Sequence, residues 1–247
     1  MRQTANEIKR RAQKANNEDE ELIEPEKCKN IACLRENARR GKFLCCQDCP
    51  RHPLRGNPVF AEGCPLHQTE SPLILFVFQD PASPKRRGVI GCSADGRVCP
   101  WCHTDFSAIN FREKLFPLIK EIVPEIEVKG RYRIYCINAV LHGPRYNAPP
   151  PTRALRSCSH ILKAYVRLLR PKIVMGLGIK ARYSLALAFG IQNFEKAPYP
   201  VIREGIAFWW TYHQAQRSFL KKQYEIETRF KIIAEFLKGQ LEGGVNG

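Results

Sequence analysis

The sequence predicts an α/β protein: a three-layer α/β/α domain around a central, mostly parallel four-stranded sheet, preceded by a cysteine-rich metal module. Two observations predict this fold. Short apolar segments alternate with helix-like segments through most of the chain, which is typical of a parallel sheet with helices on both faces. Residues 28–64 are dense in Cys, Pro, Arg and Gly, a composition that builds no core alone and favours a metal-stapled module.

Four segments have the pattern of strands and four have that of helices. Residues 73–78 are a continuous apolar run, as expected of a strand that is buried on both faces. Further strands are expected at 131–140, 172–177 and 205–212, with helices at 106–123, 152–169, 179–189 and 217–237. Thr152 is the expected N-cap of its helix.

The composition divides the chain into three parts. Residues 1–27 hold few large apolar side chains and place a basic stretch before an acidic one, which indicates a charged tail or helix. Residues 28–70 are the expected metal module, and residues 71–240 are the expected α/β domain. A length of 247 residues with 44% hydrophobic content suits one such domain and excludes wholesale disorder.

The charge balance indicates a polyanionic partner. Lys and Arg number 40 against 24 Asp and Glu, a net charge of +16, and nucleic acid is the commonest partner of such proteins. The alternative is a basic solvated surface. No apolar run reaches membrane-span length and no secretory signal opens the chain, so we expect a monomeric cytoplasmic protein, nucleoid-associated in a prokaryote and not secreted. Eleven cysteines in that setting favour metal ligation over disulfides.

Polar residues stand at the ends of three predicted strands. Asp80, Asn138 and His213 come at strand ends, and ligands of parallel sheets bind at the carboxyl ends of the strands. A carboxylate can orient water, an amide can read a base edge and an imidazole can donate to a developing anion. Taken singly, each has a structural alternative, namely a turn cap, a turn Asn or a core His. Their convergence is the informative feature.

These motifs resemble the uracil-DNA glycosylase superfamily. Residues 73–81 (LILFVFQDP) resemble its first motif, and residues 137–141 (INAVL) its uracil-reading motif. The stretch that runs through Cys158 to residues 170–181 (RPKIVMGLGIKA) is most similar to the iron–sulfur branch, families 4 and 5. The resemblance covers about residues 45–237.

The resemblance implies a monofunctional DNA repair glycosylase with water as nucleophile. Asp80 would position the water and stabilise the oxocarbenium-like sugar, and Gln79 would give a backbone contact to the base. Asn138 would read the Watson–Crick edge of a flipped uracil. His213 would donate to the uracil oxygen as negative charge builds on the leaving base.

Three departures from the family pattern affect the site. Ala82 stands where the best-known branch has a Tyr that blocks thymine. The ring that stacks on uracil has no clear counterpart, so Trp101 or Phe106 is expected to supply it. Arg217 is expected to replace the apolar wedge of the DNA-contacting loop. Gln216 and Arg145 are the other expected DNA contacts.

The metal ligands are open between two sets. By resemblance, Cys46, Cys49 and Cys158 match three ligands of a 4Fe–4S cluster, and His142 stands at the remaining position. Alternatively, a local set formed by Cys28, Cys33, Cys45 or Cys46, and Cys49 could hold zinc or a cluster.

Two further motifs have competing interpretations. Residues 99–103 (CPWCH) fit a c-type haem attachment motif, a zinc-knuckle turn with Cys92 nearby, or a pair of reduced thiols. Residues 176–181 (GLGIKA) fit G-x-G-x-x-A, but a tight strand-to-helix turn also needs small residues, so we expect no nucleotide cofactor. The rival functions are a non-catalytic metal-containing nucleic-acid-binding protein and a redox or dinucleotide-binding protein.

Overall fold

The computed structural model describes residues 22–52, 64, 66–79, 99–102, 105–143 and 148–243, the side chains of 216–218 excepted. In this part of the chain a five-stranded sheet has the order β4-β1-β5-β7-β6. Its strands are β1 (Ile74–Phe78), β4 (Ile134–Asn138), β5 (Ile173–Leu177), β6 (Val201–Arg203) and β7 (Ile206–Thr211). The strands β4, β1, β5 and β7 run parallel, which confirms the predicted sheet type.

The predicted four strands omit β6, which pairs antiparallel with β7 in a hairpin. Glu204 and Gly205 form its turn, and both have positive φ, 50° and 75°, as a two-residue type I′ turn requires. The strand predicted from residue 205 therefore begins one residue later. Because β6 has three residues and none of them is buried, it lacks the apolar run that identified the other strands.

The strand predicted over residues 131–140 is divided in two. Arg131–Tyr132 is β3, which pairs with β2 (Glu127–Val128) in a separate hairpin, and β4 begins at Ile134. Lys129 and Gly130 connect β2 to β3 with φ of 51° and 75°. The single strand predicted across residues 131–140 thus spans a change of sheet.

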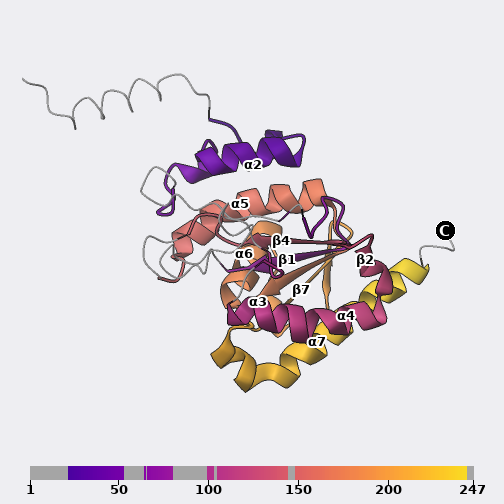
Figure 1. Ribbon diagram of the computed structural model, residues 1–247. Coiled ribbons are helices and arrows are strands. Elements are labelled where there is room, and N and C mark those ends of the chain that lie inside the picture. The colour runs from indigo at the N-terminus through magenta and orange to yellow at the C-terminus, as the bar shows by residue number, and fades with distance from the viewer. Residues whose placement is uncertain are drawn as a thin grey trace, which may run out of the picture.

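Helices cover both faces of the sheet and give the predicted three layers (Figure 1). On one face α5 (Thr152–Leu169) packs with α6 (Ile179–Phe189), and on the other α3 (Phe106–Asn110) and α4 (Phe116–Ile122) pack with α7 (Gln216–Glu242). A π-helical turn, η6 (Phe111–Leu115), joins α3 to α4, so the helix predicted at 106–123 is nearly continuous. No helix among the described residues is long and apolar enough to cross a membrane.

Thr152 is not the N-cap that the sequence predicts. Pro151 occupies the cap position in an extended conformation, with φ −68° and ψ 152°, and Thr152 is the first helical residue. The proline ring fixes φ near this value, so the chain enters α5 without a side-chain cap.

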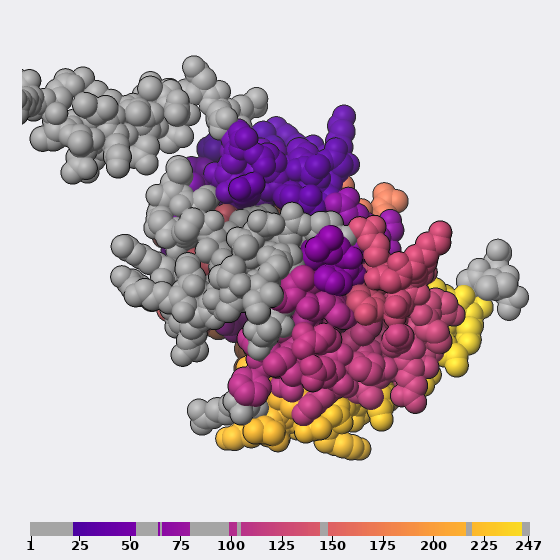
Figure 2. All heavy atoms as spheres, in the orientation of Figure 1, coloured from indigo at the N-terminus to yellow at the C-terminus, as the bar shows by residue number. Residues whose placement is uncertain are grey.

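The N-terminal segment packs on the outer side of α5 and shares its core. It contains η1 (Pro25–Lys27), α2 (Ile31–Arg40) and η2 (Leu44–Cys46), and forms the indigo upper surface in Figure 2. Leu34 and Phe43 are fully buried and belong to the same hydrophobic cluster as the central strands. The expected metal module is therefore continuous with the α/β core.

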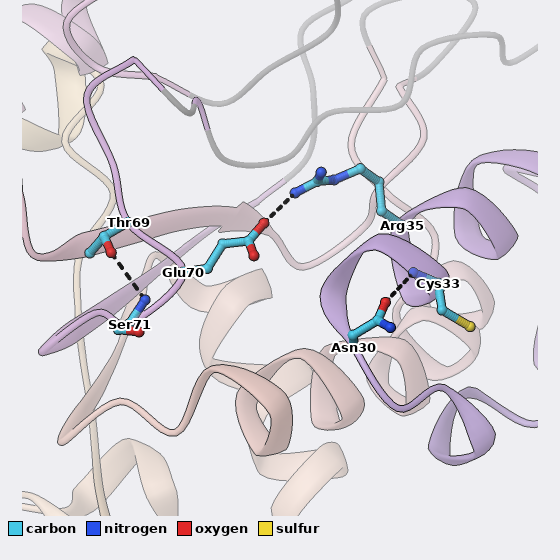
Figure 3. Close-up of polar contacts among 6 residues, drawn as sticks. All are labelled: Asn30, Cys33, Arg35, Thr69, Glu70 and Ser71. Carbon is cyan, nitrogen blue, oxygen red and sulfur yellow. Dashed lines mark hydrogen bonds and ion pairs between the residues drawn. The ribbon is translucent and has the colours of Figure 1, made fainter.

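Polar contacts cap α2 and connect it to the chain that leads into β1. Asn30 caps α2, its side-chain oxygen accepting the Cys33 N–H at 2.8 Å, and Arg35 on α2 pairs with Glu70, just before β1, at 3.1 Å (Figure 3). Thr69 Oγ1 accepts the N–H of Ser71 at 3.2 Å, which shapes the approach to β1.

Residues 66–69 cover the outer edge of β4. The N–H of Tyr132 donates to the carbonyl of His67 at 2.9 Å, and the N–H of Thr69 donates to that of Ile134 at 3.3 Å. The buried side chain of Gln68 accepts the N–H of Cys136, in the middle of β4, at 2.7 Å. An edge strand is thus covered partly by backbone and partly by a side chain.

Phe76 provides a test of the central core. Its ring on β1 is fully buried, 4.9 Å from Phe111 and 5.9 Å from Phe230 on α7. Phe76→Ala should lower the free energy of unfolding by about 3–5 kcal/mol, because a cavity forms between sheet and helices. Phe106→Ala, at a ring that is 55% exposed, should change it by less than about 1 kcal/mol. Urea denaturation measures both, and equal effects would contradict this account of the core.

Candidate active site and metal-binding clusters

The strand order determines where a ligand is expected. The chain passes from β1 to β4 on one side and then to β5 on the other, so the order reverses between β1 and β5. Ligands of open α/β sheets bind outside the carboxyl ends at such a reversal. Gln79, Asn138, Gly178 and His213 are at the carboxyl ends of β1, β4, β5 and β7, respectively.

The ends of β1 and β4 lie side by side. Phe78 is in register with Asn138, the N–H of Ala139 donates to the Phe78 carbonyl at 2.8 Å, and that of Val140 donates to the Gln79 carbonyl at 3.1 Å. Asn138 is buried. The structure therefore brings Gln79 and Asn138 together, and their contact with a base stays a prediction. Asp80, which follows Gln79, lies outside the described residues.

His213 is held as a neutral imidazole with a defined tautomer. Its Nδ1 accepts the N–H of Ala215 at 3.0 Å, so the single ring proton is on Nε2. Burial lowers the pKa of His213 below its ordinary 6.5, and the more weakly opposing charge of Asp105 does not reverse this. The ring is therefore uncharged at neutral pH and has an N–H to donate from Nε2.

Gly178 makes room for His213. The residue has a φ of +105°, and a Cβ built there would lie 3.2 Å from His213 Cβ and 3.4 Å from Cδ2. Its N–H donates to the carbonyl of Thr211 at 2.8 Å, which ties the end of β5 to the end of β7. At Gly176, a Cβ would lie 3.1 Å from Leu185 Cδ1 and 3.2 Å from the Arg182 nitrogen. Close packing thus explains why both positions of the G-x-G motif are glycine.

Two amides beside His213 were not predicted from the sequence. The side chain of Asn110 on α3 donates to the carbonyl of Gln214 at 2.9 Å. Gln214 is fully buried, and both polar atoms of its side chain lack a hydrogen-bond partner within the described ranges. Burying such an amide costs free energy unless a partner is supplied. The polar run at residues 211–214, directly after an apolar strand, is the signal that would have identified Gln214.

The two expected stacking rings occupy different environments. Trp101 is stacked on Tyr132, with ring centroids 4.2 Å apart, and makes an edge contact with Phe116 at 5.1 Å. This position is near the covered edge of β4, and it gives Trp101 a packing role. Phe106, the first residue of α3, is 55% exposed. A contact of either ring with a base stays a prediction.

The side chains of the expected DNA-contacting residues are not among those that the structure describes. Gln216 and Arg217 open α7, but the structure describes only their backbone. Arg145 lies outside the described residues.

The predicted metal-ligating cysteines fall into two groups. In the first, Cys49 and Cys158 are hydrogen-bonded, with Cys46 close enough to influence both thiols. The hydrogen bond from Cys158 lowers the pKa of Cys49 to about 7, whereas the same contact and burial raise the pKa of Cys158. This group joins the N-terminal segment to α5. Nearby His142 is buried, which lowers its pKa to about 4, and it bonds the backbone of Arg39.

In the second group, Cys28 and Cys33 face each other across the start of α2. Their sulfur atoms are 2.7 Å apart, and the Asn37 amide lies 3.8 Å and 3.5 Å from them. Both are free thiols. Burial, followed by the Cys33 hydrogen bond, raises the pKa of Cys28 to about 12.

A third cluster was not predicted as a set. Cys64, His67, Cys99 and Cys102 bring their ligand atoms within 4.8 Å of one another and could hold a metal ion; within the described ranges, no other group of three or more such ligands meets this criterion. His67 Nδ1 lies 3.8, 3.4 and 3.6 Å from the sulfur atoms of Cys64, Cys99 and Cys102, respectively. From the sequence, only Cys99 and Cys102 were predicted as a pair, with Cys92 nearby, and Cys92 lies outside the described residues. The C-x-x-H spacing of residues 64–67 was the missed signal.

Comparison with known proteins identifies a family. A family model described as the uracil DNA glycosylase superfamily matches residues 91–238, a range that includes Asn138, Gly178 and His213. No match was found among the curated proteins.

Gly178→Ala tests the coupling between the two strand ends. Gly205 has φ 75°, and Gly178 has φ 105° and ψ 165°, a region that essentially only glycine adopts, so alanine costs about 1–3 kcal/mol of stability at either position. Only at Gly178 does the new methyl group also meet a neighbour, His213. In urea denaturation Gly178→Ala should therefore destabilise more than Gly205→Ala, and the His213 ring resonances should shift in that variant alone. Identical behaviour of the two variants would refute the coupling.

Proposed function

We propose that this chain, which belongs to the uracil-DNA glycosylase superfamily, hydrolyses the N-glycosidic bond of a base flipped out of DNA. Membership supports a DNA glycosylase-like function in general. The finer proposal is that the base is uracil, that water is the nucleophile and that no lyase step follows. The observation that carries it is His213, a partly buried, neutral imidazole whose ring proton is on Nε2, at the same carboxyl end of the sheet as Asn138.

The reaction needs two fixed electrostatic partners. Hydrolysis breaks the bond between the sugar C1′ and the base nitrogen, adds the hydroxyl of water to C1′ and leaves the remaining proton for the base. In the transition state the sugar becomes positive and the base negative, so each requires a preorganised partner in a dry site. We assign the sugar and the water to Asp80, which follows β1 directly in the sequence.

His213 is suited to the base. A donor that acts on a developing oxyanion works best when it is already oriented and keeps its proton. The Nδ1 contact with Ala215 orients the ring, the missing side chain at Gly178 leaves room for it, and burial keeps it neutral. The Nε2–H would therefore strengthen its hydrogen bond to the base oxygen as negative charge accumulates there.

Base recognition is assigned to the neighbouring amides. The Asn138 side chain offers a donor and an acceptor together, as the Watson–Crick edge of uracil requires. Gln79 would contribute its backbone. The amide of Gln214, which has no hydrogen-bond partner among the described residues, is a further group that a bound base or water could satisfy. Phe106 has the more exposed of the two rings proposed to stack on the base.

Binding to DNA is attributed to the basic surface. A net charge of +16 favours contacts with several phosphates, and each released counterion makes affinity more sensitive to salt. Arg217 and Gln216 follow His213 closely in the chain and would contact the groove beside the flipped base, with Arg145 as a further contact.

A 4Fe–4S cluster is proposed at Cys46, Cys49 and Cys158, with zinc as the alternative. The convergence of three thiols supports metal binding, and His142 follows Leu141, whose backbone contacts Cys158. Cys28 and Cys33 form their own pair and would serve only a local ligand set. A metal group here would supply a covalent tie between the N-terminal segment and α5 rather than chemistry at the base.

His213→Ala should lower the rate of uracil release by roughly two to three decades, because one electrostatic partner of the transition state is lost. Asp80→Asn should do so by a similar factor. His160→Ala is the matched control, since His160 is exposed on α5 and should leave the rate unchanged. The assay is alkaline cleavage of a uracil-containing oligonucleotide under single-turnover conditions. Near-normal rates in both site variants would overturn the assigned roles.

The pH dependence follows from the lowered pKa of His213. Because burial favours the neutral ring, the folded protein takes up this proton only below the ordinary value of 6.5. Uracil release should stay level above that pH and decline below it. The unfolded chain is protonated first, so the contribution of His213 to stability also falls as pH drops below 6.5. Comparison of pH–rate profiles for wild type and His213→Gln tests this, and a wild-type decline centred above 6.5 would contradict it.

A further inference from the structure

We propose that Cys64, His67, Cys99 and Cys102 bind one zinc ion in a closed structural site, separate from the thiols of Cys46, Cys49 and Cys158. The four residues come from two short segments on either side of β1, and both segments lie near the outer edge of β4. Cys64 and Cys99 are 1% exposed and form a small cluster with Trp101 and Cys102, apart from the main core.

The distances match tetrahedral zinc. Zinc binds sulfur at about 2.3 Å and imidazole nitrogen at about 2.0–2.1 Å, so the tetrahedral angle places sulfur and nitrogen about 3.6 Å apart. The three distances from His67 Nδ1 to sulfur are 3.8, 3.4 and 3.6 Å. A cubane cluster would hold its ligands at the corners of an iron–sulfide cube, wider apart than the 4.8 Å that contains these atoms.

The backbone shapes both ligand pairs. Gln68 N–H donates to the carbonyl of Cys64 at 3.0 Å, and Cys102 N–H donates to that of Cys99 at 3.0 Å. Each bond closes a tight turn, so the two ligands of a pair point to the same side. The C-x-x-H and C-x-x-C spacings together give a Cys₃His set, which is a composition of structural zinc sites. Four protein ligands leave no open position for a substrate.

The ion would tie together the chain that precedes β1 and the chain that precedes α3. The first segment covers the edge of β4 through the carbonyl of His67 and the side chain of Gln68. The second stacks Trp101 on Tyr132 and accepts a hydrogen bond from Arg112, at 3.0 Å, on the carbonyl of Pro100. Zinc would thereby close a loop from Cys64 to Cys102, which contains β1, Gln79 and Asp80. The inference does not depend on the proposed glycosylase activity.

Metal analysis of the full-length protein tests the site. Wild type should carry about one equivalent of zinc, and Cys99→Ser and Cys102→Ser should each lose most of it. Cys158→Ser should keep this zinc, and so should Cys136→Ala, the matched control, which removes a buried thiol on β4 outside the ligand set.

Cobalt spectroscopy tests the site even if the serine variants fail to fold, because it is measured on wild type. Cobalt exchanged into wild type should give the intense visible bands of a tetrahedral site together with thiolate charge-transfer absorption. His67→Cys preserves four donors, so it should still bind cobalt, with a spectrum shifted toward that of an all-thiolate site. The proposal is overturned if wild type binds neither zinc nor cobalt in stoichiometric amount. It is equally overturned if zinc survives in Cys99→Ser but is lost in Cys158→Ser, or if iron occupies the site.

Discussion

The parallel pairing of β1 with both β4 and β5 is the constraint on which the rest of the structure depends. Because these strands and β7 all run in the same direction, their carboxyl ends lie together at one end of the strands. The Phe78–Asn138 register places Gln79 beside Asn138, and the hydrogen bond from Gly178 to Thr211 draws the end of β5 to that of β7. The candidate site is therefore a product of strand direction and register, and its side chains come from segments far apart in the sequence.

His213 shows how closely such a site depends on its neighbours. A neutral histidine has one ring N–H, so it can donate to a bound base only if that proton is on the outward nitrogen. The N–H of Ala215 fixes the tautomer, burial keeps the ring neutral, and the absence of a side chain at Gly178 leaves the ring its position. Gly178 belongs to a stretch that fits a nucleotide-binding motif, but its need for glycine is explained by the close approach of the His213 ring.

Much of this architecture could be predicted from the sequence, for physical reasons. A strand such as β1, buried on both faces, must be apolar throughout, so residues 73–78 were recognisable. By contrast, β6 is short and lies at the sheet edge, where burial imposes no pattern, and Pro151 displaced the cap expected at Thr152. Asn138 and His213 were identified because they stand at the ends of predicted strands. Cys64 and His67 were missed because their partners are more than 30 residues away, and only the fold shows which cysteines meet.

The cover on β4 has a consequence for the protein's behaviour in a concentrated solution. An exposed edge strand offers unpaired N–H and carbonyl groups to any other strand, and edge-to-edge addition of this kind starts aggregation. The side chain of Gln68 accepts the N–H of Cys136. The backbone of residues 67–69 forms hydrogen bonds with Tyr132 and Ile134. A segment without regular secondary structure therefore keeps the sheet from growing at β4, while the short β6 ends it on the opposite side.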